Sequence, residues 1–361
     1  MRSRVLCGLA AAVALLATGC GSDGGAKSGD ASPAAPAASA AAAAFPVKVT
    51  DCAGKETTFD AAPKKIVTSN ASSLEMLLQL GAGDKVIGTG FPPGKGTLPA
   101  AIADQAAKVP VLGTMVISKE KLLGSGADLY VDTFASVGGM GGGMGTAPTD
   151  QEYAAAGIKH VFLHSTACAA MLKGPQQDLA EVEADIKRLG QVTGTSAKAD
   201  DLVAGMEKKV GAVKTAIAGV PADKRPTYFF FDFDAGTKQP MAVCGKQVAN
   251  AVITLAGARN VFADCDGDFK PVSWEDVVAK NPDWIQLGVR NKGSEADNTK
   301  AFDEAEKFLR EFPATKDLKA VQEGHFLRVG SEVTTIAGVR NADTVQQIAH
   351  TIHPDLVKDG Q

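Results

Sequence analysis

The chain has 361 residues, with 37 Lys and Arg against 41 Asp and Glu and a formal net charge of −4. This slightly acidic balance, without a basic stripe, argues against nucleic acid as a partner. The one long apolar run, Leu6 to Ala17, is too short to cross a bilayer as a helix.

The N-terminus has the pattern of a secretory signal. Arg2 and Arg4 precede the apolar run, which ends in Ala17-Thr18-Gly19-Cys20. These small residues before a cysteine resemble the lipobox of bacterial lipoproteins, although leucine is commoner than alanine at the position of Ala17. We therefore expect residues 1–19 to be a signal peptide and Cys20 to be lipidated, which places the protein on the extracytoplasmic face of the cell membrane. The alternative is an ordinary signal peptide with an incidental cysteine.

Residues 20–44 consist almost entirely of Gly, Ser, Ala, Pro and Asp. Such a segment buries too little apolar surface to offset its chain entropy. We expect a disordered, lipid-anchored linker between Cys20 and a folded body that begins at Phe45.

Strand and helix patterns alternate along that body. Apolar or β-branched strand patterns occupy residues 64–70, 85–90, 127–134, 159–164, 227–234, 283–289 and 325–330. Helical patterns occupy residues 72–81, 150–157, 178–194, 200–219, 248–257, 273–282, 304–312 and 344–352. This alternation predicts an α/β fold with mainly parallel sheets.

Two consecutive helices without an intervening strand divide the pattern near its middle. The second has apolar residues at helical spacing, from Leu202 to Ile217, and would be roughly 30 Å long. We expect an N-terminal ligand-binding lobe over 45–195, an interlobe helix over 196–220 and a C-terminal ligand-binding lobe over 221–361.

Four cysteines remain after the signal and the lipidation site: Cys52, Cys168, Cys244 and Cys265. An even number outside the cytoplasm indicates disulfides, with three possible pairings. We favour Cys52–Cys168 and Cys244–Cys265, each within one lobe; four free thiols are the alternative. The absence of a C-x-x-C pattern gives no support to a metal cluster.

Three passages resemble one known family. They are KKIVTSNASSLEMLLQLGAGDKVIGTG, NAVITLAGARNVFADCDGDFKPVSWEDVVAKNPDWIQL and FLREFPATKDLKAVQEGHFLRVGSE, and they bracket most of the folded body. They are similar to the periplasmic-binding proteins of ABC importers for iron-siderophores, haem and cobalamin. The resemblance implies two rigid lobes joined by one helix (class III), a small-molecule ligand in the interlobe cleft, and a monomer without catalysis or cofactor that works with a permease and its ATPase.

The resemblance also implies one exposed glutamate per lobe that docks onto arginines of the permease. Glu75 in SSLEM and Glu275 in VSWED match these positions. Local chemistry offers a second interpretation, because Ser72 with Glu75 and Ser273 with Asp276 have the spacing of helix capping boxes.

Loops at the carboxyl ends of the strands should line the cleft. This rule selects the following ligand-binding candidates: Ser69, Asn70, Thr89, Phe91, Thr133, Phe134, Ser136, His164, Ser165, Asp232, Asp234, Trp274, Arg290 and Asn291. Trp274 could equally belong to the core.

Some of these residue types suggest other chemistry. Met140 and Met144, in a glycine-rich loop, suit an apolar lip, soft-metal capture or a plain surface loop. Asp232 and Asp234 could serve acid–base chemistry, but no nucleophile or metalloprotease motif accompanies them. An enzyme or a surface sensor lipoprotein is therefore the minor hypothesis.

The low numbers of Tyr and Trp, 3 and 2, favour an iron(III)-siderophore ligand over a large planar one. Cobalamin, haem and an anionic cofactor precursor remain alternatives.

Overall fold

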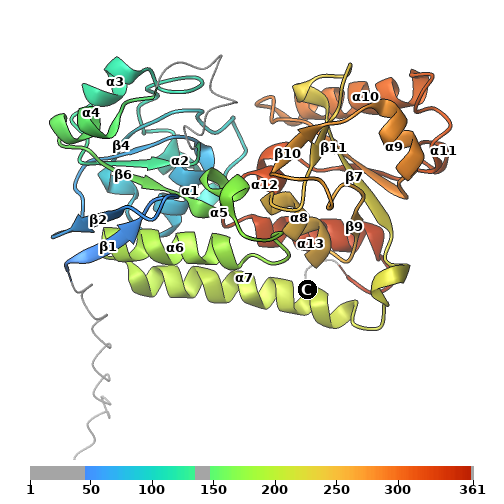
Figure 1. Cartoon of the computed structure of the whole chain (residues 1–361), viewed down its shortest axis with the longest axis horizontal. Helices are drawn as coiled ribbons and strands as arrows, with labels where there is room; N and C mark the ends of the chain where they lie inside the picture. The colour runs from blue at the N-terminus through green and yellow to red at the C-terminus, as the bar shows by residue number, and fades with distance from the viewer. Residues whose placement is uncertain (1–44, 135–146, 359–361) are drawn as a thin grey trace, which may run out of the picture. The chain divides into compact units, whose positions relative to one another are not determined.

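The computed structural model describes residues 45–134 and 147–358. The expected signal peptide, Cys20 and its linker, Ser136, Met140 and Met144 lie outside these ranges. Within them the chain forms two lobes, each built on a parallel sheet (Figure 1). This is the α/β architecture with two separate sheets that the sequence predicts.

The N-terminal lobe has a four-stranded parallel sheet in the order β4-β3-β5-β6. An antiparallel hairpin of β1 and β2 precedes it. Its strands are β1 Val47–Thr50, β2 Glu56–Phe59, β3 Ile66–Thr68, β4 Val86–Thr89, β5 Leu129–Asp132 and β6 Lys159–Phe162. Its helices are α1 Ala71–Gln79, η1 Gly83–Lys85, α2 Ala100–Ala106, α3 Lys119–Leu123, α4 Asp150–Ala155, α5 His164–Ala167, η3 Ala169–Met171 and α6 Ala180–Thr193.

The C-terminal lobe repeats this plan with the parallel order β12-β11-β7-β9 and an antiparallel pair of β8 and β10. Its strands are β7 Thr227–Asp232, β8 Met241–Val243, β9 Arg259–Asn260, β10 Phe269–Pro271, β11 Trp284–Gly288 and β12 Phe326–Arg328. Its helices are η4 Ala222–Lys224, η5 Phe233–Ala235, α8 Val248–Leu255, α9 Trp274–Lys280, α10 Glu295–Glu311, α11 Lys319–Glu323, α12 Ser331–Thr335 and α13 Asn341–Ile352.

The helix expected between the lobes is α7, Ser196–Ala216. It packs against α6 of the N-terminal lobe and against α8 and α13 of the C-terminal lobe (Figure 1). Val203, Met206 and Val213 on its inner face are almost fully buried. One apolar cluster runs from Val49 in β1 through these residues to Ile348 in α13. The two lobes therefore share a core along α7.

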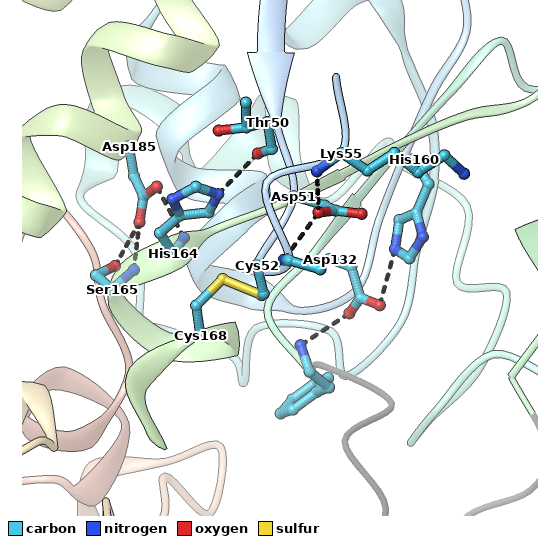
Figure 2. The surroundings of a disulfide bond; sticks show 12 residues. Thr50, Asp51, Cys52, Lys55, Asp132, His160, His164, Ser165, Cys168 and Asp185 are labelled. Atoms are coloured by element: carbon cyan, nitrogen blue, oxygen red, sulfur yellow. Dashed lines mark hydrogen bonds and ion pairs between the residues drawn. A yellow bond between two sulfur atoms is a disulfide. The ribbon is translucent and has the colours of Figure 1, made fainter. Parts of the chain in front are cut away.

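Both disulfides favoured from the sequence are present. Cys52–Cys168 joins the turn after β1 to the end of α5 (Figure 2). Cys244–Cys265 closes a much shorter loop in the C-terminal lobe. Each bond therefore lies within one lobe.

The capping of α1 differs from the prediction. Asn70, not Ser72, is the N-cap, and its side chain accepts from the Ser73 backbone N–H at 3.0 Å. The Ser72 hydroxyl instead donates to the carbonyl of Ala337, across the two lobes, at 2.5 Å. The predicted pair of Ser273 and Asp276 does form a capping box at the start of α9. Sequence spacing alone does not show that Ser273 caps its helix while Ser72 does not. Near α1, the side chain of Asn70 can also act as the N-cap.

Candidate functional site

The carboxyl ends of β3, β4 and β5 carry a buried polar network. Thr68 donates to Thr89 at 2.8 Å, and the Ser69 and Thr133 hydroxyls lie 2.9 Å apart. Asn70 Nδ2 donates to the same Thr133 hydroxyl at 2.7 Å. All of these side chains are at most 2% exposed. The short side chains of Ser69, Asn70, Thr89 and Thr133 thus bond to one another and brace the strand ends, and their contact with a ligand stays a prediction.

Two phenylalanines extend beyond that network. Phe91 and Phe134 are both partly exposed, and their ring centroids are 5.5 Å apart. Phe91 has a φ of 32°, which is rare for a residue with a bulky side chain. Its N–H donates to Met115 and its carbonyl accepts from Ala71, the first residue of α1. Strained backbone that the surroundings hold in place is common at ligand clamps. The ligand contact expected of Phe91 and Phe134 stays a prediction, and their partial exposure is compatible with it.

A buried carboxylate positions Phe134. Asp132 Oδ1 accepts from the Phe134 N–H at 2.8 Å, and Oδ2 lies 3.1 Å from His160 Nε2. The His160 ring in turn packs against Tyr130, Tyr153 and Phe162. The sequence analysis did not select Asp132 and His160 as site residues. A signal for them was present, because they lie on the adjacent strands β5 and β6, and β5 leads into the loop that carries Phe134.

His164 and Ser165 lie at the start of α5, directly after β6 (Figure 2). His164 Nε2 donates to the Thr50 carbonyl at 2.8 Å, and Nδ1 accepts from Arg188. Ser165 is fully buried, and its hydroxyl donates to Asp185 at 2.5 Å. In this structure His164 anchors the N-terminal hairpin and Ser165 anchors α6; the ligand contacts expected of them stay predictions.

The strand ends of the C-terminal lobe carry charged groups instead. Asp234 accepts from the Arg290 backbone N–H at 2.6 Å and from Lys292 Nζ at 2.7 Å. Arg290 Nη2 lies 3.8 Å from Asp232, and 58% of the arginine side chain is exposed. Burial raises the pKa of Asp232, although the Arg290 charge opposes this shift. The group therefore offers an exposed cation beside partly buried carboxylates.

A cavity of about 670 Å³ lies next to this group. Lys95 and Gly96 of the N-terminal lobe form one wall; Asn291, Gly293 and the first turns of α10 form the other. Its volume is within the range of small-molecule sites. Asn291 is the predicted ligand residue that borders it, while Lys95 was not selected because its loop carries no strand signal.

Trp274 belongs to the core. It is 5% exposed, its Nε1 donates to the Thr237 carbonyl at 2.8 Å, and its ring packs edge-on against Phe231. Of the two interpretations left open by the sequence, the structure supports the packing one.

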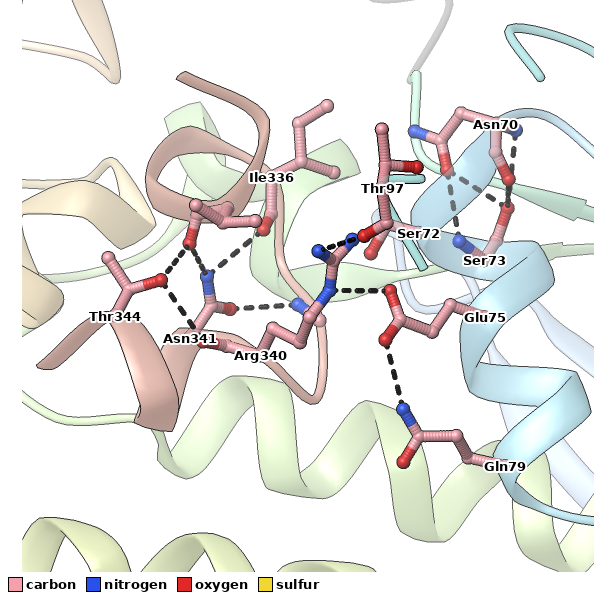
Figure 3. A network of polar contacts seen from close by, with 12 residues as sticks. Asn70, Ser72, Ser73, Glu75, Gln79, Thr97, Ile336, Arg340, Asn341 and Thr344 are labelled. Carbon is pink, nitrogen blue, oxygen red and sulfur yellow. Dashed lines mark hydrogen bonds and ion pairs between the residues drawn. The ribbon is translucent and has the colours of Figure 1, made fainter. Parts of the chain in front are cut away.

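The two candidate docking glutamates, Glu75 and Glu275, differ sharply in solvent exposure. Glu275, in the first turn of α9, is exposed. Glu75 is only 3% exposed, because Arg340 at the start of α13 covers it and Nε of that arginine donates to its carboxylate at 2.8 Å (Figure 3). The expected exposure of Glu75 is therefore wrong. Arg340 had no sequence signal, since it is 265 positions away from Glu75.

The described residues also bear on metal binding and on membrane spanning. Within 45–134 and 147–358, no three His, Cys, Asp or Glu side chains are grouped so that they could hold a metal ion. None of the helices in that part of the chain combines the length and apolarity needed to cross a membrane.

A model of the periplasmic binding protein family matches residues 66–333, from β3 of the first sheet to α12 of the second lobe. The chain belongs to this family. The match covers both strand-end groups and the cavity between Lys95 and Asn291.

Among curated proteins, the chain is similar to the uncharacterized ABC transporter substrate-binding lipoprotein YvrC of Bacillus subtilis. The two are 24% identical over 347 residues, and the alignment covers 96% of each chain. The chain is 25% identical over 255 residues to a cobalamin-binding protein of Halobacterium salinarum; this alignment covers 68% of the chain and 59% of the relative.

Solved structures show the same fold. A periplasmic binding protein from Veillonella parvula superposes with a TM-score of 0.71 at 27% identity, covering 85% of this chain and 97% of that one. A protein of an ABC-type Fe³⁺-hydroxamate transport system from Saccharomonospora viridis superposes with a TM-score of 0.68 at 22% identity, covering 86% and 100%.

Proposed function

We propose that the protein is the substrate-binding lipoprotein of an ABC importer, which captures a bulky metal chelate of the iron(III)-siderophore type between its lobes and delivers it to a permease. The observation that carries this proposal is the family match over 66–333 together with a cavity walled by residues of both lobes. A binding protein needs no catalytic group. The two carboxylates at the site, those of Asp232 and Asp234, form ion pairs with Arg290 and Lys292.

The chemistry of the site supports a ligand with two different faces. The N-terminal lobe offers the Phe91 and Phe134 rings, and the C-terminal lobe offers Arg290, Lys292 and Asn291. An iron(III)-hydroxamate chelate has an apolar periphery and exposed carbonyl oxygens, which suit rings on one side and cationic donors on the other. The Fe³⁺-hydroxamate system named for the Saccharomonospora structure is consistent with this choice.

Cobalamin is the second candidate ligand. The name of the Halobacterium relative favours it, at 25% identity over 68% of this chain. Its corrin amides could also use Asn291 and Lys95, and its apolar ring face could contact Phe91.

Calorimetric titration of the protein starting at Phe45 separates these ligands. Ferrichrome, ferrioxamine B, cyanocobalamin and haemin are the probes. Calorimetry is preferable to tryptophan fluorescence, because Trp274 is buried in the core and Trp284 stacks on His325. Heat from a ferric hydroxamate alone supports the siderophore; heat from cyanocobalamin alone replaces it with cobalamin. No heat from any of the four contradicts the ligand class.

Delivery to a permease is tested at Glu275. Glu275→Gln should leave ligand affinity unchanged and abolish uptake by cells. Glu207→Gln is the control, because Glu207 is also exposed but lies in the middle of α7, away from the first turn of a helix. Normal uptake by the Glu275 variant would contradict its docking role.

A further inference from the structure

Two neighbouring strands of the N-terminal sheet place a histidine beside a carboxylate. The register of β5 and β6 pairs Tyr130 with His160 and Asp132 with Phe162. Because side chains alternate along a strand, these four residues lie on one face of the sheet. Val131, between Tyr130 and Asp132, belongs instead to the apolar cluster of the opposite face. Strand register therefore brings the Asp132 carboxylate and the His160 ring together.

Aromatic rings enclose His160 and limit how its imidazole can turn. The centroid of its ring lies 4.1 Å from that of Phe162, 4.6 Å from that of Tyr153 in α4 and 5.4 Å from that of Tyr130. Only 13% of the His160 side chain and 7% of the Asp132 side chain are exposed. Figure 2 shows the imidazole turned toward Asp132, whose Oδ2 is 3.1 Å from Nε2. Nε2 therefore carries the proton of this bond, because a carboxylate oxygen only accepts.

Asp132 links this histidine to the loop beyond β5. Its second oxygen, Oδ1, accepts from the N–H of Phe134 at 2.8 Å. An aspartate that accepts from the N–H two residues ahead forms an Asx turn, which needs the side chain in a matching rotamer. The bond from His160 holds Asp132 in that rotamer, since loss of the donor would leave a buried carboxylate oxygen unsatisfied. The backbone of Phe134 therefore depends on a histidine of the neighbouring strand.

Phe134 supplies one half of an aromatic pair. Its ring centroid is 5.5 Å from that of Phe91, with 53° between the ring planes. Phe91 is fixed independently, because its N–H donates to Met115 and its carbonyl accepts from Ala71. A change in the backbone at Phe134 would therefore alter the spacing and tilt of the two rings.

The groups around His160 differ in the pH at which they change charge. The titratable groups beside it come from β5 and α4; they are Tyr130, Asp132, Asp150 and Tyr153. Burial raises the pKa of both tyrosines, and a hydrogen bond from Lys55 lowers the pKa of Asp150. These three groups therefore keep one charge state between about pH 5 and pH 8, where histidine ordinarily titrates. Protonation of the imidazole would turn its contact with Asp132 into a bond between two ions, which is stronger.

We propose that His160 is a positioning residue of the ligand site: it holds Asp132, Asp132 holds the backbone of Phe134, and the aromatic side of the site is held more firmly when the imidazole is protonated. The inference rests on the proposed importer function, which gives Phe134 a ligand to contact. His160 acts through Asp132 and not by contact with the ligand. Binding should therefore respond to pH through a buried histidine, even when the ligand carries no titratable group.

Hydrogen exchange at the Phe134 amide tests this chain of bonds without a ligand. The mature protein is labelled with ¹⁵N-phenylalanine, and nuclear magnetic resonance gives a protection factor for each phenylalanine amide. Phe134→Leu and Phe231→Leu assign the two signals that are compared. Phe231, fully buried in a middle strand of the other sheet, is the reference for global loosening.

His160→Leu and His160→Gln form a matched pair, because both remove the ring and only glutamine retains an N–H donor. The leucine variant should lower the protection of Phe134 about tenfold and leave that of Phe231 unchanged. The glutamine variant should retain most of the protection. In the unaltered protein, the protection of Phe134 should rise severalfold from about pH 7.5 to about pH 5.5, and this rise should be absent from the glutamine variant.

Equal protection of Phe134 in the two variants would overturn the proposal. A pH response that persists in His160→Gln would do the same, since that response would belong to Asp132. Should His160→Leu also lower the protection of Phe231, the unaltered protein decides alone: a rise at Phe134 in acid supports the positioning role, and a constant protection factor contradicts it.

Calorimetry then connects the positioning to binding. With whichever of the four probes gives heat, His160→Leu should weaken the affinity about three- to tenfold, and His160→Gln should retain most of it. An unchanged affinity in the leucine variant would contradict a role in the ligand site. Heat from none of the probes would defeat the proposed ligand class, while the protection factors would still decide whether His160 positions Phe134.

Discussion

The strand ends of the two lobes occupy equivalent places in two parallel sheets, yet their side chains differ in length, charge and burial. In the N-terminal lobe they are short and neutral, buried, and bonded to one another across β3, β4 and β5. In the C-terminal lobe they are charged, partly exposed and paired around Asp234 and Arg290. The position of a residue at a strand end therefore predicts which residues lie near it, but not whether its side chain is exposed to a ligand. That exposure depends on the length and charge of the side chain.

The disulfides allow the two lobes to be compared directly. Cys52–Cys168 spans 116 positions and Cys244–Cys265 spans 21. Loop-closure entropy predicts that removal of the first bond costs about 5 kcal/mol and removal of the second about 3 kcal/mol. Double serine variants of each pair, unfolded in urea, measure this difference. Equal losses would show that the shared core, rather than chain entropy, sets the cost.

The buried network of the N-terminal lobe should be more sensitive than the charged group of the other lobe. Asn70→Ala removes the α1 cap and the bond to Thr133 together, and should cost about 2–4 kcal/mol of unfolding free energy. Asp234→Ala, its counterpart in the C-terminal lobe, should cost about 1 kcal/mol or less, because it breaks a more exposed pairing. Thermal unfolding of both variants checks the order; a larger loss at Asp234 would contradict the comparison.

Phe91 should show a backbone effect that is separate from its ring. Both Phe91→Ala and Phe91→Gly remove the ring, but only glycine adopts a positive φ without strain. We expect the glycine variant to be more stable than the alanine variant by about 1 kcal/mol. Both should lose affinity for the ligand found by calorimetry. Equal stability of the two variants would show that the conformation at Phe91 carries no strain.

The smallest effect is expected from the pH response of Asp232. Because burial raises its folded-state pKa above the ordinary 3.8, the folded protein retains this proton longer than the unfolded chain. The stability that this gives is complete below about pH 3.8 and is lost as the pH rises through the folded pKa. Asp232→Asn should therefore gain melting temperature relative to the unaltered protein between pH 3 and pH 7. A constant difference over this range would contradict the raised pKa.

The fold was largely accessible from the sequence because strand and helix periodicities are local. The residues 200–219 predicted a long helix, and α7 occupies Ser196–Ala216. The expected 304–312 helix, in contrast, is only the end of α10, which begins at Glu295 because Ser294 caps it ahead of a polar first half. Polar helical turns carry little periodicity, so their start was missed.

The site was less accessible, since it depends on which side chains meet. Asn291 does border the cavity, and Phe91 and Phe134 do pair. The fate of Glu75 was hidden, because its environment is set by Arg340 from the far end of the chain. The surroundings of Ser165 were hidden for a similar reason, because Asp185 on α6 accepts hydrogen bonds from both its hydroxyl and its backbone N–H.

The apolar cluster that passes from β1 along α7 into α13 leaves no seam at which the chain could be cut into independent halves. A fragment ending before α7 would expose to water the face of α6 that packs on it, and a fragment beginning after α7 would expose the facing sides of α8 and α13. The molecule should accordingly melt in a single calorimetric peak, and neither half should be recoverable alone as a folded, monomeric piece.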